Sequence, residues 1–205
     1  MLTNFEQFPG YWVEEDSHEV QTADLSEISR KPLEISRLKP DPRYVTSGRA
    51  NAEGIAVLYC ASDIKTALLE VRAPAGSACT VAECVNTREL NLADLREVKS
   101  ASSWNTLKQA KQCLKNEIAS MFSQRIVGSS AIRHYRLTQH ISEHLRERSY
   151  DGIIFSSSQG LGWNYAFFDI DLLNIKEREM VEIESVDLKY QALPEKTFSV
   201  DGKDY

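Results

Sequence analysis

The order of apolar and polar positions predicts a chain in which short strands alternate with helices. A near-continuous apolar run at residues 55–61 has the length and composition of a buried strand. Ser62 follows in the position of a helix N-cap, and Asp63 suits the first turn. The next apolar residues recur at helical spacing and predict a helix with one face on the core: Ile64, Ala67, Leu68 and Val71.

Similar patterns predict further elements on both sides of this strand and helix. Leu33, Ile35 and Arg37 alternate with polar residues and predict a short strand. Further strands are expected at residues 78–86, 89–95, 153–156 and 165–170, with an edge strand at 181–190. Helices are expected at residues 103–124 and 131–148; the apolar stripe of the first is Trp104, Leu107, Leu114, Ile118 and Phe122. We therefore expect a single α+β domain with a split, strand-rich core.

The first part of the chain has a different character from the rest. Residues 1–32 are polar and acidic, and their aromatic side chains cluster near the start. Pro9 and Gly10 should break any long element there. We expect an N-terminal arm that packs its aromatic side chains on the domain of residues 33–205 or on a second copy of the chain. A homodimer is therefore a candidate assembly.

Composition narrows the function classes. The 205 residues suffice for one sizeable domain, and the net charge of −6 argues against broad binding of a nucleic-acid backbone. A small anionic ligand would need a locally basic pocket. No stretch of 18 apolar residues and no signal-peptide pattern occur, so a cytoplasmic protein without a membrane span is expected. The four cysteines form no CxxC pair and are expected to be reduced, mostly buried thiols.

Three segments stand out because they occur in one order with matching local patterns. They are "ISRLKP" at residues 35–40, "GRANAEGIAVLYCASDIKTALLEVR" at 48–72 and "YDGIIFSSSQGLGWNYAFF" at 150–168. Together they resemble the RES domain family, named for its Arg, Glu and Ser. The resemblance covers residues 32–171, and the middle segment follows the family pattern nearly residue for residue.

The resemblance implies a fold related to ADP-ribosyltransferases, with a split β-sheet core and flanking helices. It also implies an enzyme that cleaves NAD, as its substrate, at the nicotinamide–ribose bond by phosphorolysis or hydrolysis. Many family members are bacterial toxins that a helix-turn-helix antitoxin neutralises, so such an antitoxin and inorganic phosphate are implied partners. Two alternatives stay open: a mono-ADP-ribosyltransferase that modifies a protein, and a catalytically silent module that binds NAD or a partner.

The family's functional residues map onto particular positions of this chain. The family arginine, tyrosine and glutamate fall at Arg37, Tyr59 and Glu70. The family serine falls at Ser157, with Ser156 and Ser158 as alternatives one residue away. Ser156 stands where family members often carry proline, which leaves the register of the serine open.

These residue types suit the chemistry of NAD cleavage. A planar guanidinium binds phosphate oxygens in pairs, so Arg37 is the first candidate for the diphosphate, and Arg49 is a candidate for a second phosphate contact or a ribose contact. A carboxylate such as Glu70 can stabilise the positive charge that develops on the ribose as nicotinamide leaves. Tyr59 can pack against the nicotinamide or its ribose. Polar residues that can line the rest of the site are Asn51, Ser156, Ser157 and Asn164.

Other motifs favour plain structural roles. His140 and His144 lie four residues apart on a predicted helix, but no His-Glu-x-x-His motif or third ligand accompanies them, so no metal is expected. The lone Gly-x-Gly at residues 160–162 lacks the context of a dinucleotide-binding turn. The serine triplet does not match the Gly-x-Ser-x-Gly pattern of esterases.

Overall fold

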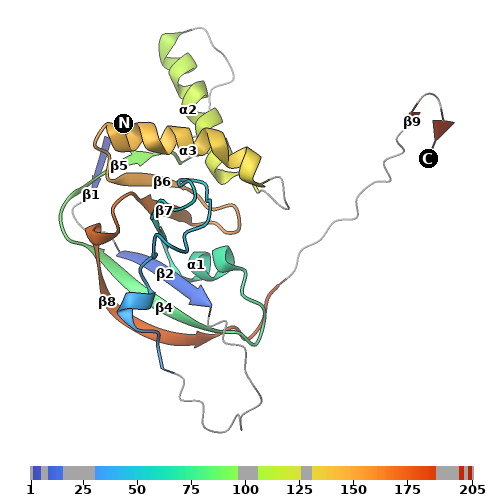
Figure 1. The fold of residues 1–205 in the computed structure, drawn as a ribbon. Coiled ribbons are helices and arrows are strands. Elements are labelled where there is room, and N and C mark those ends of the chain that lie inside the picture. Colours follow the sequence, from blue (N-terminus) through green and yellow to red (C-terminus); the bar gives the residue numbers. More distant parts are fainter. Residues whose placement is uncertain are drawn as a thin grey trace.

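The described residues form ten strands, three α-helices and two short 3₁₀ helices. The computed structural model describes residues 2–5, 9–15, 31–96, 106–125, 131–187, 199–200 and 203–204 (Figure 1). The strands are β1 (Leu2–Phe5), β2 (Pro9–Glu15), β3 (Leu58–Ala61), β4 (Ala78–Asn86), β5 (Leu90–Asp94), β6 (Gly152–Ser156), β7 (Trp163–Phe167), β8 (Leu173–Glu182), β9 (Ser199–Val200) and β10 (Lys203–Asp204). The helices are η2 (Ile35–Arg37), α1 (Ile64–Val71), α2 (Leu107–Ser123), α3 (Ala131–Glu147) and η3 (Ile170–Leu172).

The main sheet has eight strands in the order β1-β5-β6-β7-β3-β2-β4-β8, and β9 and β10 form a separate two-stranded sheet. Strands β5 and β6 run parallel, whereas the other described pairs are antiparallel. Strand β2 pairs with β3 through one residue pair, Tyr11 with Ala61, so the sheet divides at this point. This divided sheet with its helices is the single α+β domain that the sequence predicted.

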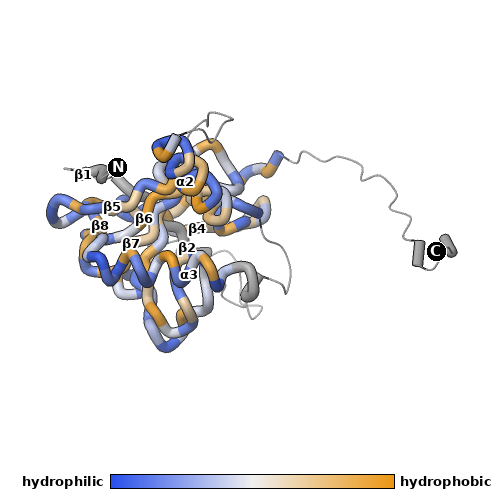
Figure 2. The backbone as a smooth tube through the Cα atoms, turned by 90° about the horizontal axis from the view of Figure 1, so that it is seen from above, coloured by the Kyte–Doolittle hydropathy of each residue, from blue (hydrophilic) through white to orange (hydrophobic). Residues whose placement is uncertain are grey.

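The core has two layers because both faces of the β5–β6–β7 region are covered. On one face, Ile153 and Phe155 of β6 pack with Phe122 of α2, alongside partly buried Ile141 and Leu145 of α3. On the other face, a second cluster joins β3, β5, β6 and β7 to residues of β4 and β8. Helix α1 packs its apolar side on a third cluster that includes Ala61 and Val81. Apolar and hydrophilic positions alternate along α2 and α3, as expected of amphipathic helices (Figure 2).

The N-terminal segment contributes to the main sheet. Strand β1 pairs with β5, and β2 lies between β3 and β4, with seven residue pairs from Pro9–Val85 to Glu15–Cys79. Pro9 is the first residue of β2, a position where a strand tolerates proline. Residues 9–15 therefore hold the two parts of the sheet together, and Phe8 lies outside the described residues.

Several boundaries differ from the predicted ones. The strand expected around Leu33 and Ile35 is wrong: Arg37 donates its backbone N–H to the Glu34 carbonyl and closes the 3₁₀ turn η2. The Leu33 backbone N–H goes to the Thr80 side chain instead of a strand partner. Strand β3 begins at Leu58, three residues later than expected, because residues 55–57 belong to the preceding loop.

The cap of α1 and two later strands also differ from the prediction. Asp63, not Ser62, is the N-cap, because its carboxylate accepts the Thr66 backbone N–H at 2.8 Å. Strand β7 spans Trp163–Phe167 and ends earlier than predicted. The edge strand expected at 181–190 is β8 at Leu173–Glu182, and residues 188–190 lie outside the described part.

Helix α2 is covered by the core along only part of its length. Its buried residues are Ala119 and Phe122, near the C-terminal end, whereas Leu107 and Leu114 are 73% and 63% exposed. Figure 1 shows the N-terminal half of α2 extending away from the sheet. The apolar stripe predicted for this helix is therefore only half buried, and Trp104 lies outside the described residues.

Candidate active site

Glu70, Ser157 and Asn164 meet in one polar cluster. The Ser157 hydroxyl donates to Glu70 Oε1 at 2.6 Å, and the Asn164 side-chain amide donates to the same oxygen at 2.8 Å. Glu70 lies near the end of α1, Ser157 follows β6, and Asn164 is a buried residue of β7. Two donors from different elements thus hold one carboxylate oxygen of Glu70.

The loop after β6 fixes the direction of the Ser157 hydroxyl. Its oxygen accepts the backbone N–H groups of Gln159 at 3.1 Å and Gly160 at 3.0 Å. A hydroxyl has one proton to donate, and with two donors already at its oxygen the proton points to Glu70. Ser157 therefore orients the carboxylate while the loop orients Ser157.

The structure separates Ser157 from its two neighbours. Ser156 pairs with Trp163 at the end of the β6–β7 ladder. The Ser158 hydroxyl receives only a long contact of 3.4 Å from the Gln159 side chain. Among the three serines, Ser157 is the one with a hydrogen bond to Glu70 in the described part of the chain.

Gly162 allows the loop between β6 and β7 (residues 157–162, the serine loop) to pack against the start of α1. A Cβ atom on Gly162 would lie 2.3 Å from Thr66 Oγ1 and 2.5 Å from Asp63 Oδ2, so a side chain does not fit there. Asp63 also accepts hydrogen bonds from the hydroxyls of Ser62 and Thr66, each at 2.8 Å. Burial acts to raise the pKa of Asp63, but these hydrogen bonds outweigh it and hold the pKa below its ordinary value. Asp63 therefore stays ionised and caps the helix that carries Glu70.

Tyr59 uses its hydroxyl to hold a neighbouring loop. The hydroxyl accepts the Ala50 backbone N–H at 2.9 Å and donates to Asn51 Oδ1 at 2.8 Å. Asn51 in turn donates to the carbonyls of Thr46 and Ala52. Burial raises the pKa of Tyr59 far above its ordinary value, despite the hydrogen bond from Ala50. The phenol therefore stays protonated and acts here as a structural donor.

Two further residues, Gly48 in this loop and Gln139 on α3, explain the shape of the loop. A Cβ atom on Gly48 would lie 2.5 Å from Asn51 Oδ1 and 2.8 Å from the Tyr59 hydroxyl, so only glycine fits. The side-chain amide of Gln139 on α3 donates to Ser47 Oγ and to the Gly48 and Asn51 carbonyls, at 2.7 to 2.8 Å. Gln139 is a positioning residue that no sequence motif marked.

Tyr59 and Asn164 lie on the same face of the sheet. Tyr59 pairs with Ala166 and Ala61 pairs with Asn164, so Tyr59 and Asn164 are diagonal neighbours across β3 and β7. The ring of Tyr59 is thus close to the cluster around Glu70, although its hydroxyl is turned toward Asn51. Tyr59 therefore shares a face of the sheet with Asn164, which binds Glu70, and the grouping of Tyr59 and Glu70 in one site stays a prediction.

Arg49 is fixed at the C-terminal end of α2. Its guanidinium donates to the backbone carbonyls of Met121 and Gln124. The same group stands over the ring of Tyr135, with 5.7 Å between the guanidinium carbon and the ring centroid. The carbonyl groups at the end of a helix carry partial negative charge, so they favour a cation at this position.

Arg125 is a second cation beside the site, and sequence analysis did not single it out. Its Nε donates to the Ser158 carbonyl at 2.6 Å, one residue from Ser157. The contact joins the segment after α2 to the serine loop across 33 positions of sequence. Only the long-range pairing reveals it, because a lone arginine past a helix end carries no motif.

Arg37 lies on a different segment from the Glu70 cluster. It is exposed at the end of η2, and its side chain makes no hydrogen bond or ion pair with other described residues. The residues before it are tied to β4 and β8, through Leu33 to Thr80 and Arg178 to Leu33. None of these contacts brings Arg37 to Glu70, so its role in the site stays a prediction.

The remaining candidates have structural partners. Cys60, Cys79 and Cys84 are buried and Cys113 is partly buried, and burial raises the pKa of Cys60. His140 and His144 contact Glu143 and Glu147 one turn further along α3. Within the described residues no group of three or more His, Cys, Asp and Glu could hold a metal ion. Nor does any described helix have the length and apolar character needed to cross a bilayer.

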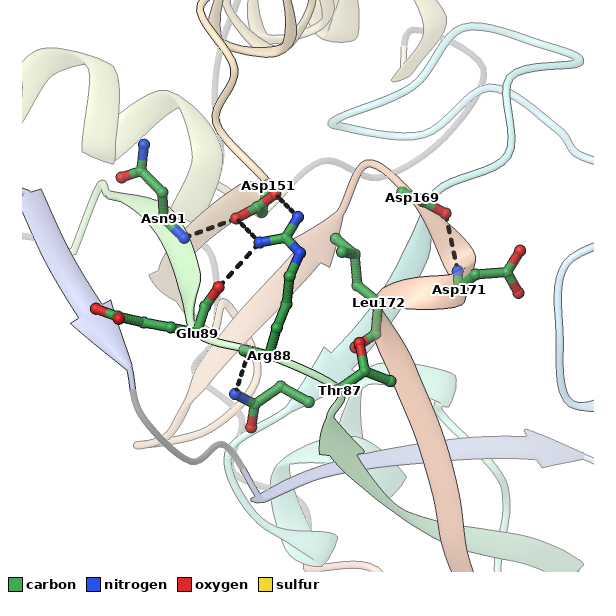
Figure 3. A network of polar contacts seen from close by, with 9 residues as sticks. Thr87, Arg88, Glu89, Asn91, Asp151, Asp169, Asp171 and Leu172 are labelled. Carbon is green, nitrogen blue, oxygen red and sulfur yellow. Dashed lines mark hydrogen bonds and ion pairs between the residues drawn. The ribbon is translucent and has the colours of Figure 1, made fainter.

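A separate polar network lies where β5 and β6 begin (Figure 3). A cavity of about 520 Å³ is lined there by Arg88, Glu89, Leu90, Asn91, Ser149, Tyr150 and Asp151. Arg88 binds both carboxylate oxygens of Asp151, at 2.6 and 3.0 Å, and Asp151 also accepts the Asn91 backbone N–H at 2.8 Å. Because Asp151 and Asn91 also pair through Asp151 N–H and the Asn91 carbonyl, this network is a structural clamp between the two parallel strands.

Comparison with known proteins places the chain in a family. A family model described as the RES domain matches residues 27–190. The chain belongs to the RES domain family. The resemblance predicted from the three segments is therefore confirmed, over a longer range than those segments cover.

Comparisons with curated proteins and with solved structures give less information about this chain. Among curated proteins, no match to this RES domain was found. A similar solved structure is the crystal structure of the M.tuberculosis MbcT-MbcA toxin-antitoxin complex, with 10% sequence identity and a TM-score of 0.49. The match covers 88% of this chain and 87% of that chain.

Proposed function

We propose that this RES domain cleaves NAD at the nicotinamide–ribose bond and releases nicotinamide. The observation that carries the proposal is the carboxylate of Glu70, held by Ser157 and Asn164 on the face of the sheet that also carries Tyr59. Membership of the RES family supports NAD as the substrate. Phosphate or water would accept the ADP-ribosyl group.

The arrangement suits the charge that develops during this cleavage. As nicotinamide departs, the ribose gains oxocarbenium-like positive charge, which a fixed carboxylate stabilises. Ser157 and Asn164 both bind Oε1 of Glu70, and no described residue donates to Oε2. The second oxygen is therefore available to the ribose or its hydroxyl groups, while the first is anchored.

The diphosphate of NAD would need positive charge near this carboxylate. Arg49 supports such a role because it lies next to Ala50, whose N–H binds the Tyr59 hydroxyl. Arg37 has an unengaged guanidinium among the described residues, and the family resemblance assigns it to the substrate. Asn51 acts through Tyr59 as a positioning residue. We further propose that NAD loss makes the protein a toxin and that a helix-turn-helix antitoxin restrains it.

The experiment is incubation of the purified full chain with NAD, with and without inorganic phosphate, followed by chromatography and mass analysis. Nicotinamide release with ADP-ribose-1″-phosphate indicates phosphorolysis, and release with ADP-ribose indicates hydrolysis. A mass increase on protein indicates ADP-ribosyl transfer instead. If micromolar protein leaves NAD intact over hours, the proposed cleavage is wrong, and an NAD-induced rise in Tm would then indicate a silent binding module.

A further inference from the structure

Two arginines, Arg49 and Arg125, make contacts at the C-terminal end of α2 and at the serine loop. Arg49 donates to the carbonyls of Met121 and Gln124, and Arg125 donates to the carbonyl of Ser158. The Gln124 carbonyl belongs to the peptide bond that joins Gln124 to Arg125. The Arg49 guanidinium therefore lies beside the backbone of Arg125, although the two residues are far apart in sequence.

We infer that Arg125 is a phosphate-binding residue of the Glu70 site, and that it acts together with Arg49. The phosphate group belongs either to the diphosphate of the nucleotide or to inorganic phosphate that accepts the ADP-ribosyl group. The inference rests on the proposed cleavage of NAD. It adds a residue that neither the family motifs nor the sequence pattern identifies.

The position of Arg125 ties it to the reacting cluster. Its Nε binds the carbonyl of Ser158 at 2.6 Å, and the preceding residue, Ser157, binds Glu70. The contact ties the Arg125 guanidinium to the residue that follows Ser157, the serine that binds Glu70. A diphosphate is attached directly to the riboses of NAD, so a cation beside the ribose site has the right placement.

The contacts of Arg125 leave it able to bind an anion. Arg125 is exposed, and its two terminal nitrogens make no hydrogen bond or ion pair with described residues. Arg49, in contrast, uses two of its nitrogens on helix carbonyls. A guanidinium offers paired N–H groups that match two phosphate oxygens, so Arg125 can bind phosphate without losing its contact with Ser158.

Local charge strengthens the inference. The chain carries 30 acidic and 24 basic side chains, so an anionic ligand requires a basic region against the general charge. Some arginines of this chain are paired with acidic residues, as Arg43 is with Asp41, Arg88 with Asp151 and Arg96 with Asp94. Arg125 has no acidic partner among the described residues, which leaves its full charge beside the Glu70 cluster.

The test compares Arg125→Gln and Arg125→Lys with a matched control, Arg136→Gln. Arg136 is an exposed arginine of α3 with no ion pair among the described residues. The KM for NAD is measured at saturating phosphate, the KM for phosphate at saturating NAD, and kcat and Tm in both series. We expect Arg125→Gln to raise one KM roughly ten- to hundredfold while kcat and Tm change little. Arg125→Lys should recover part of the loss, and Arg136→Gln should match the wild type.

A rise in the KM for NAD would show that Arg125 binds the diphosphate of NAD. A rise in the KM for phosphate would show that Arg125 binds the inorganic phosphate that accepts the ADP-ribosyl group. If both KM values stay at the wild-type level, or if only kcat and Tm fall together, Arg125 is a loop anchor and the inference is wrong. Should the wild type release no nicotinamide, the proposed function fails by itself. Calorimetric binding of NAD and of inorganic phosphate then decides on Arg125: tighter binding by the wild type than by Arg125→Gln supports the inference, and equal or absent binding overturns it.

Discussion

At the scale of single residues, hydrogen-bond partners distinguish three adjacent serines that look alike in sequence. Ser157 donates to Glu70 and accepts two backbone N–H groups of its own loop. Neither Ser156 nor Ser158 has a hydrogen bond to Glu70 among the described residues. The register that the sequence left open therefore has a structural candidate, Ser157, whose hydroxyl binds the Glu70 carboxylate.

Replacement of Ser157 by alanine should lower kcat/KM for NAD cleavage by about ten- to hundredfold, because Glu70 loses a charge-assisted hydrogen bond that holds its orientation. Steady-state nicotinamide release measures the effect. Ser158→Ala keeps the backbone carbonyl that binds Arg125, so this neighbouring variant should stay within about threefold of the wild type. A larger loss in Ser158→Ala than in Ser157→Ala would contradict the assignment.

A variant of Tyr59 without its hydroxyl tests whether that group stabilises the fold or takes part in the reaction. Tyr59→Phe removes the hydrogen bonds to Asn51 and Ala50 and should lower the free energy of unfolding by about 1–2 kcal/mol. Urea unfolding measures this change, with Tyr44→Phe as the control because Tyr44 is 77% exposed. Unchanged stability with a complete loss of cleavage would show that the hydroxyl acts in the reaction.

At the scale of elements, helix α1 and the loop after β6 form one unit that presents Glu70. The helix begins at an ionised Asp63 cap, and the loop contacts that cap through a glycine without room for a side chain. The two elements are far apart in sequence, and their contact brings Ser157 to Glu70. Displacement of the loop should therefore impair the site before it unfolds the domain.

Gly162→Ala should displace the loop, because its Cβ atom would lie 2.3 Å from Thr66 Oγ1. We expect a loss of about 1–3 kcal/mol in the free energy of unfolding, together with a clear fall in kcat/KM. Gly160→Ala is the matched variant, since its Cβ atom would come closest to the flexible end of Leu69, at 3.2 Å, and would lie at ordinary contact distances of 3.6 and 3.9 Å from Thr66 Oγ1 and Ser157 Oγ. Equal behaviour of the two variants in urea unfolding and nicotinamide release would contradict the role of the close contact.

The clamp between β5 and β6 predicts a dependence of stability on pH. Burial acts to raise the pKa of Asp151, but the hydrogen bonds from Arg88 and the Asn91 N–H outweigh it and lower the pKa. A folded-state pKa below the unfolded value of about 3.9 adds stability above that pH, and the added stability disappears as the pH falls through the folded-state pKa.

Asp151→Asn should therefore lower the free energy of unfolding at pH 7 by about 2 kcal/mol, since a paired carboxylate that is 15% exposed is lost. The difference from the wild type should shrink as the pH falls below about 4. Urea unfolding across this pH range measures it. Asp41→Asn, in an exposed pair with Arg43, should leave the midpoint unchanged. A constant difference for Asp151→Asn at all pH values would argue against the carboxylate as its source.

Elements with a strong local pattern could be predicted from sequence. Strand β4 has the predicted bounds, and α1, α3 and β6 lie within a few residues of theirs. Glu70 and Asn164 were also predicted for the site, because the family pattern marks the segments that carry them. Strand β2 could not be predicted, since its proline and acidic residues weaken the local pattern and its place depends on pairing with β4. Arg125 could not be predicted for the site either, because only its contact with Ser158 identifies it.

At the scale of the whole molecule, the two faces of the divided sheet have different roles. Strands β4 and β8 close one face of the core, while the other face, under α2 and α3, carries Tyr59, Asn164 and the Glu70 cluster. The loops that bring Arg49 and Arg125 come from the same side. An acidic protein can in this way present a small basic region beside a fixed carboxylate, which is the combination that a dinucleotide requires.

The most direct test is the rate of nicotinamide release by Glu70→Gln, which keeps the size of the side chain and removes its charge. With saturating NAD, we expect the rate to fall by about 10²- to 10³-fold, because the positive charge on the ribose in the transition state is no longer stabilised by a carboxylate. Glu117→Gln is the control, since Glu117 is exposed on α2, and it should match the wild type. If Glu70→Gln releases nicotinamide at the wild-type rate while NAD remains saturating, the assignment of the active site to Glu70, Ser157 and Asn164 is contradicted.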